Sequence, residues 1–215
     1  MGSFFSLEGG LFAGMSKLFD MLFLSVLWVI GCIPIVTIGA STTALYYTTA
    51  KVIRKERGYV AGEFWRSFKS NFLTSVIYTV ILLLFSAVMV FNLMYIRDNK
   101  NGFNNFLSYV YILLSYLAYS ITVYLFPVLS RFKMGRSRML KFSLFLSMKH
   151  LPTTLLLQIV VVCFAFLIWI MPPTAFILPA VGAYFCSLSI EKVFKKYMPV
   201  PEDADPDTLD WFYTF

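Results

Sequence analysis

Long apolar runs alternate with short polar stretches along the chain. Five runs have the length of a membrane-spanning helix, which needs roughly 20 mostly apolar residues. They cover residues 18–36, 72–96, 106–129, 153–170 and 174–194. A sixth apolar segment, 38–50, joins directly onto the first run and is short for a full crossing. The pattern predicts an all-α, polytopic transmembrane helical bundle with five clear spans and a short sixth element.

The end of the chain has a different composition, which divides it into two parts. Residues 1–198 are predicted to form a single transmembrane helical domain, and residues 199–215 an acidic, proline-containing tail. Such a tail is typical of an extended, solvated segment. Its last residues are aromatic: Trp211, Phe212, Tyr213 and Phe215. Two interpretations stay open, because these rings can return to the membrane interface or dock onto a partner protein.

Lysine and arginine gather in alternate loops. Of the 18 basic residues, six lie in 51–69, six in 131–149 and three in 192–196, whereas Arg97 and Lys100 stand in an intervening loop. Loops rich in lysine and arginine remain in the cytoplasm. The charge pattern therefore predicts that the C-terminus and the N-terminus are both cytoplasmic, and it accounts for the net charge of +7.

The short element 38–50 contains glycine and hydroxyl residues where hydropathy indicates membrane. Small residues let helices approach closely, and irregular backbone at membrane depth must be buried or face a cavity. The element is therefore predicted to pack inside the bundle after a break, although a re-entrant segment in a five-span protein is an alternative. The predicted packing, substrate or partner face consists of Pro34, Thr37, Gly39, Ser41, Thr42, Thr43 and Tyr46.

Both basic loops carry apolar residues at helical spacing, which predicts two cytoplasmic amphipathic helices at the interface. The loops align at an offset of 80 residues, which suggests a parallel repeat, although any two basic loops share such a pattern. Residues from both loops and from the tail are candidates for docking a partner. They are Trp65, Phe68, Lys69, Phe145, Met148, Lys149, Trp211, Phe212, Tyr213 and Phe215.

Composition narrows the class of protein further. Charged residues make up 13% of the chain, against about 25% in soluble domains, so a soluble globular protein is excluded. Three scattered cysteines and a single histidine, His150, give neither metal-ligand spacing nor a catalytic constellation. We expect no enzyme, no cofactor and no nucleic-acid partner, and the chain has no ATP-binding motif of its own.

One long stretch resembles a known family. The sequence "FDMLFLSVLWVIGCIPIVTIGASTTALYY" is similar to the amino-terminal signature of the YesL-like family, small bacterial integral membrane proteins grouped as a domain of unknown function. Two later stretches, "FWRSFKSNF" and "FLSMKHLPTTLLL", look like its loop-to-span junctions. The resemblance covers about residues 10–195 and implies a bacterial cytoplasmic membrane location.

Members of this family are commonly found beside genes for carbohydrate uptake, including ABC importers for oligosaccharides. The resemblance therefore implies an accessory or scaffold membrane subunit that assists an importer, with the importer's permease subunits as partners. A stand-alone small transporter or facilitator for a neutral solute such as a sugar is the alternative. The hydroxyl residues of 38–50 favour the alternative, whereas the lack of a charge in the middle of any clear span speaks against coupled transport.

Overall fold

The computed structural model describes residues 4–98, 102–132 and 134–198, and all regular elements within these ranges are helical. Seven α-helices follow one another along the chain: α1 Phe4–Gly31, α2 Ile38–Thr48, α3 Val60–Asp98, α4 Gly102–Arg131, α5 Arg136–Lys149, α6 Leu151–Ile170 and α7 Leu178–Phe194. Three short turns connect them: the 3₁₀ turns η1 Ile35–Thr37 and η3 Pro172–Phe176, and the π-helical turn η2 Thr49–Ile53. The all-α prediction is confirmed.

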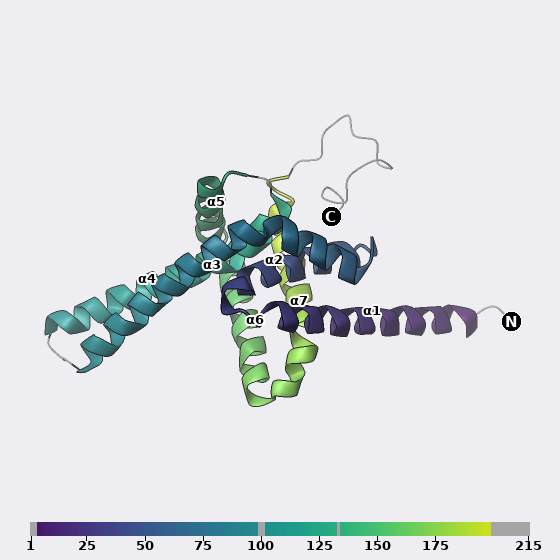
Figure 1. Ribbon diagram of the computed structural model, residues 1–215, viewed down its shortest axis with the longest axis horizontal. Coiled ribbons are helices and arrows are strands. Elements are labelled where there is room, and N and C mark those ends of the chain that lie inside the picture. The colour runs from purple at the N-terminus through teal and green to yellow at the C-terminus, as the bar shows by residue number, and fades with distance from the viewer. Residues whose placement is uncertain (1–3, 99–101, 133, 199–215) are drawn as a thin grey trace.

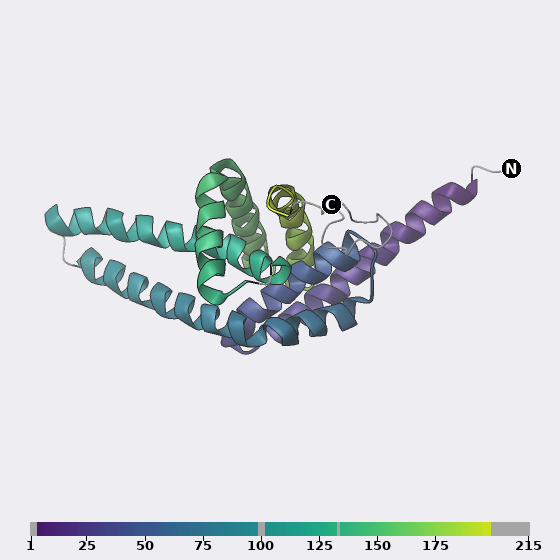
Figure 2. The same cartoon turned by 90° about the horizontal axis from the view of Figure 1, so that it is seen from above.

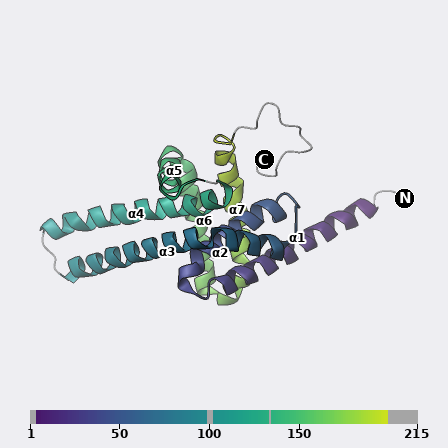
Figure 3. The ribbon, with the colours of Figure 1, turned by 45° about the horizontal axis from the view of Figure 1, so that its top comes forward.

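Two helical hairpins, α3–α4 and α6–α7, and the beginning of helix α1 extend from a common centre. Helices α3 and α4 lie side by side and reach to the left in Figure 1, while α6 and α7 run across them. Figure 2 shows α1 extending from the centre in the direction opposite to α3 and α4. Helix α2 lies where these elements meet, between α1 and α3 (Figure 3). The short predicted element is therefore the centre of the fold.

Four helices within the described ranges are long and apolar enough to cross a membrane. They contain the segments Gly14–Gly31, Val60–Arg97, Gly102–Arg131 and Leu151–Ile170. Helix α7 has 17 residues, which lies at the lower end of the range for a spanning helix, roughly 17–25 residues. Large apolar side chains such as Leu84, Phe91 and Leu113 are exposed on the outer faces. These surfaces are suited to contact with a lipid bilayer, as in a multi-pass membrane protein.

The first predicted amphipathic helix does not stand alone. Residues 60–70 form the beginning of α3, which continues without a break to Asp98. The helix continues because its sequence lacks residues that break helices. Its only glycine, Gly62, lies in the first turn, and the next proline along the chain is Pro127. Nothing in the sequence therefore ends the helix at the edge of the apolar run. The second predicted amphipathic helix is a separate helix, α5.

The chain reverses direction between α1 and α2. Helix α1 ends at Gly31, five residues before the predicted end of its span at residue 36. Pro34 follows in an extended conformation, as the break predicted here requires. The Thr37 hydroxyl lies 2.7 Å from both the Gly31 and the Pro34 carbonyl oxygens. This hydroxyl satisfies a carbonyl that the end of α1 leaves without a helical partner.

Candidate functional site

Helix α2 is almost completely enclosed by the rest of the protein. Nine of its eleven residues are buried, and it packs against α1, α3, α4 and α7. Ile38 is exposed at its start, and Thr42 is half-buried. The prediction that this element packs inside the bundle is therefore confirmed.

The seven residues predicted for this face occupy different environments. Five of them are buried: Thr37, Gly39, Ser41, Thr43 and Tyr46. Thr42 is half-buried, and Pro34 is exposed in the turn before α2.

Gly39 is the point of closest approach. A Cβ atom there would overlap the Thr79 hydroxyl of α3 and the Phe126 ring of α4. The absence of a side chain at Gly39 thus lets three helices meet at one position.

Two threonine hydroxyls of α2 and one of η2 bond to backbone carbonyls of the preceding helical turn. Thr42, Thr43 and Thr49 each donate to the carbonyl oxygen four residues earlier, at 2.8 Å. One contact crosses to α3, where the hydroxyls of Thr43 and Ser75 lie 3.3 Å apart. Back-bonding of this kind satisfies a hydroxyl in an apolar environment without a partner from another helix.

A buried ionic cluster holds one side of α2. The Tyr46 hydroxyl donates to Glu191 Oε1 of α7 at 2.9 Å. Arg131, the last residue of α4, binds the other oxygen, Glu191 Oε2, at 2.5 Å. The Arg131 side chain is 1% exposed and the Glu191 side chain 7% exposed. Three helices therefore meet at a charge pair that is removed from solvent.

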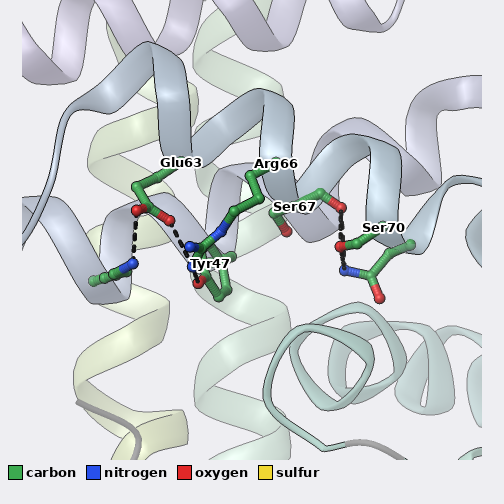
Figure 4. A network of polar contacts seen from close by, with 7 residues as sticks. Tyr47, Glu63, Arg66, Ser67 and Ser70 are labelled. Carbon is green, nitrogen blue, oxygen red and sulfur yellow. Dashed lines mark hydrogen bonds and ion pairs between the residues drawn. The ribbon is translucent and has the colours of Figure 1, made fainter. Parts of the chain in front are cut away.

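A second ionic cluster lies on another side of α2, where α3 begins. Glu63 forms ion pairs with Lys51 Nζ at 2.7 Å and with Arg66 Nη2 at 3.0 Å. Arg66 also donates to the Tyr47 hydroxyl, so Glu63, Arg66 and Tyr47 converge between α3 and α2 (Figure 4). Lys51 and Arg66 lie 5.7 and 5.9 Å from the centre of the Tyr47 ring, within range of cation–π attraction.

The sequence reasoning missed the pair formed by Arg131 and Glu191. In the sequence, Arg131 begins the basic group in 131–149, and Glu191 lies within the predicted span 174–194. Sixty residues separate the two in sequence, so no local pattern joins them. One signal was present, because Glu191 is the sole acidic residue between Asp98 and Glu202. An isolated carboxylate within an apolar run predicts a cation as its buried partner.

Two cavities flank α2. One, of about 420 Å³, lies between α3 and α4 and includes Gly39, Thr79 and Phe126 in its wall. The other, of about 290 Å³, lies among α1, α2, α4, α6 and α7 and includes Thr42 and Tyr46. The second cavity thus adjoins the buried ionic cluster, since Tyr46 belongs to both.

The predicted docking residues fall into two groups. Trp65 and Lys69 are exposed and Phe68 is half-buried on the first turns of α3, where the Trp65 and Phe68 rings lie 5.4 Å apart. The residues of the other loop are exposed on α5: Phe145, Met148 and Lys149. The four tail residues lie outside the described residues: Trp211, Phe212, Tyr213 and Phe215.

His150 lies between α5 and α6, away from both ionic clusters. Its Nε2 atom is 3.1 Å from the Tyr197 hydroxyl. Burial, together with Lys196 and Lys149, lowers the pKa of His150. Within the described residues, no three histidine, cysteine, aspartate or glutamate side chains gather closely enough to hold a metal ion.

Fold and site together define an all-helical protein with several helices suited to a membrane and a buried ionic cluster at its centre. Residues 21–93 match the family described as "Protein of unknown function, DUF624". The matched range contains α2 and most of α3, and it supports the assignment to a family of unknown function. No curated protein and no solved structure matched the chain.

Proposed function

We propose that this chain is an accessory subunit in a bacterial cytoplasmic membrane that assists oligosaccharide uptake by an ABC importer. In this role the permease and the ATPase are separate chains, and both termini of the subunit lie in the cytoplasm. The exposed face of α5 is the observation that carries the proposal. We define this α5 face by four apolar residues and one basic residue: Leu140, Leu144, Phe145, Met148 and Lys149.

The α5 face has the composition of a protein contact. Its apolar side chains are exposed, whereas the opposite face of α5 packs against the protein through Met139 and Leu146. Lys149 lies over the rings of Phe145 and Tyr197, at 5.1 and 5.3 Å from their centres. An apolar patch with a basic and aromatic rim is characteristic of a surface that binds another protein. Helix α5 also lies outside the four segments suited to spanning a membrane.

The alternative, a stand-alone facilitator for a neutral sugar, receives less support. A sugar needs hydrogen-bonding groups along its path, but Thr42, Thr43 and Thr49 bond to backbone carbonyls. The cavity beside Tyr46 is lined almost entirely by apolar atoms. These features fit helix packing and an apolar occupant better than the passage of a polyhydroxyl solute.

The decisive experiment is purification from native membranes in a mild detergent, with quantitative mass spectrometry of the proteins that co-purify. We expect importer permeases in a fixed ratio with the wild-type chain. Alanine at Leu144, Phe145 and Met148 together should remove them. The matched control places three alanines on the exposed side of α6, at Leu155, Leu156 and Ile159, and should retain them. Equal recovery from both triple variants would refute the role of the α5 face.

A second experiment separates the two functions. Thr42→Val removes a hydroxyl that borders the cavity while keeping the shape of the side chain. An accessory subunit should support sugar uptake by cells unchanged with this substitution. Loss of uptake at wild-type protein levels, together with sugar flux through the purified chain in liposomes, would favour the facilitator.

A further inference from the structure

The cavity beside Tyr46 combines an apolar interior with a basic end. We infer that it binds an anionic phospholipid, with one acyl chain in the cavity and the phosphate at Arg54 and Lys55. This inference does not depend on the proposed role in carbohydrate uptake.

The wall of the cavity is suited to hydrocarbon. Its lining includes Val123, Phe164, Ile168 and Ile190, and its volume is about 290 Å³. Three hydroxyl groups in its lining already have partners, because Thr42 and Thr122 bond to backbone carbonyls and Tyr46 bonds to Glu191. A water molecule in a cavity needs two to four polar partners, whereas apolar cavities stay dry and accept apolar ligands.

A lipid chain can reach this cavity from the side. Val161 and Ala165 of α6 belong to the lining and are exposed on the surface of the protein. Helix α6 is one of the four helices suited to crossing a membrane. The opening therefore lies on a helix that contacts the bilayer, where acyl chains are the most abundant apolar groups. This position favours an acyl chain over a second protein as the occupant.

Two basic residues lie next to the wall of the cavity, although neither belongs to its lining. Arg54 Nη1 donates to the Ser187 carbonyl at 3.2 Å, and the preceding residue, Cys186, lines the cavity. Lys55 is half-buried beside Arg54. Burial, followed by the charge of Arg54, lowers the pKa of Lys55.

The charges around Lys55 are mostly positive. Arg54, Arg57 and Arg131 all act on it, against the single carboxylate of Glu191, which Arg131 and Tyr46 already bind. A phosphate would add a second negative charge to this basic end. Basic pockets between transmembrane helices are a known mode of recognition of anionic headgroups.

The test is to count bound lipids. The full chain is reconstituted into vesicles of equal parts phosphatidylglycerol and phosphatidylcholine, extracted in mild detergent and examined by native mass spectrometry. We expect one phosphatidylglycerol per wild-type chain. Ala165→Phe closes the opening and should abolish the retention of phosphatidylglycerol. The position is exposed, so the substitution should not impair folding. Gly182→Leu fills the cavity from α7 and should have the same effect.

A paired substitution tests the headgroup site. Arg54→Gln with Lys55→Gln should reduce the preference for phosphatidylglycerol over phosphatidylcholine by roughly tenfold or more, since each cation near a membrane surface contributes about 1 kcal/mol. Arg138→Gln with Lys141→Gln, two exposed positions on α5, is the matched control and should keep the preference.

Three results would overturn the inference. They are a wild-type chain without bound phospholipid, an Ala165→Phe variant that retains as much as the wild type, and a wild-type chain that retains phosphatidylcholine as often as phosphatidylglycerol. The last result would show that the cavity binds hydrocarbon without using the basic end.

Discussion

Tyr46 and Tyr47 are neighbours in the sequence, yet they join different ionic clusters, one with α4 and α7 and the other with α3. Tyr46 donates to the Glu191 carboxylate, which Arg131 also binds. Tyr47 accepts from Arg66, which binds Glu63. Each cluster thus consists of a tyrosine, an arginine and a glutamate. Their exposure differs: the Arg131 side chain is 1% exposed, whereas that of Arg66 is 62% exposed.

This difference in exposure means that the same three kinds of side chain contribute differently to the stability of the fold. A buried charge that loses its partner keeps the full cost of its removal from water. An exposed arginine that loses its partner returns to solvent, so the net loss is small. We therefore expect the Glu191 cluster to control the stability of the fold and the Glu63 cluster to make a minor contribution. Four experiments test this comparison.

The largest effect should come from Arg131→Met. It leaves the Glu191 carboxylate buried without its cation, at an expected cost of about 3–5 kcal/mol. The measurement is equilibrium unfolding in detergent micelles by circular dichroism. The control is the double variant Arg131→Met with Glu191→Met, which removes both charges and should recover most of the loss. If the double variant were as unstable as the single one, the loss of stability at Arg131 would come from the shape of the side chain and not from its charge.

The next effect compares the two tyrosines directly. Tyr46→Phe removes a hydrogen bond to a buried carboxylate, and such bonds contribute about 1.5–3 kcal/mol. Tyr47→Phe removes a bond to an exposed guanidinium and should cost less than about 1 kcal/mol. Both variants delete the same hydroxyl from the same helix, so each is the control for the other. Equal losses in unfolding experiments would contradict the comparison.

A smaller effect is expected at Glu63. Glu63→Gln removes the charge that Lys51 and Arg66 share. It should cost less than Arg131→Met, because the Arg66 side chain is 62% exposed, although Lys51 and Glu63 are 11% and 14% exposed. Added salt should reduce the difference from the wild type, because it screens exposed charges. For Arg131→Met, by contrast, salt should have little influence. A strong dependence on salt at Arg131 would place that cluster in contact with solvent.

The smallest effect extends the comparison to a third tyrosine contact, between His150 and Tyr197. Burial lowers the pKa of His150 in the folded protein, so the unfolded chain binds the proton more readily. The contribution of His150 to the free energy of unfolding is therefore constant well above its unfolded pKa of about 6.5. The stability of the protein falls as the pH drops through that value. The melting temperature should decrease slightly between pH 7.5 and 5.5, and less so for His150→Gln. An identical decrease in both proteins would exclude this histidine as the cause.

The sequence predicted the features that depend on local chemistry. The reversal at Pro34, the burial of Gly39 and the helical character of all described elements follow from backbone preferences and side-chain size. Hydropathy also located the four helices suited to a membrane, because the transfer of an apolar run to lipid depends on its own composition. The fifth predicted span, 174–194, contains the 17-residue α7 and stays a prediction. The beginning of α3 was misjudged, since a change from amphipathic to apolar pattern does not itself end a helix.

The candidate site was predictable only in part. The packing role of α2 could be inferred from its small residues, but the partners of Tyr46 and Tyr47 could not. Glu63 lies close to Tyr47 in sequence, whereas Glu191 lies 145 residues from Tyr46. Contacts at such separation are set by how the helices assemble. A local pattern contains no information on that assembly.

The length of α3 has a mechanical consequence. Its 39 residues span about 58 Å at 1.5 Å per residue, whereas the hydrocarbon core is about 30 Å thick. The helix must tilt steeply or project beyond the core at one end or both. Because it is one continuous rod, a push on its first turns, where Glu63 and Trp65 lie, also displaces its far end at Asp98. Helix α3 is thus long enough to couple the positions of two points that lie further apart than the hydrocarbon core is thick.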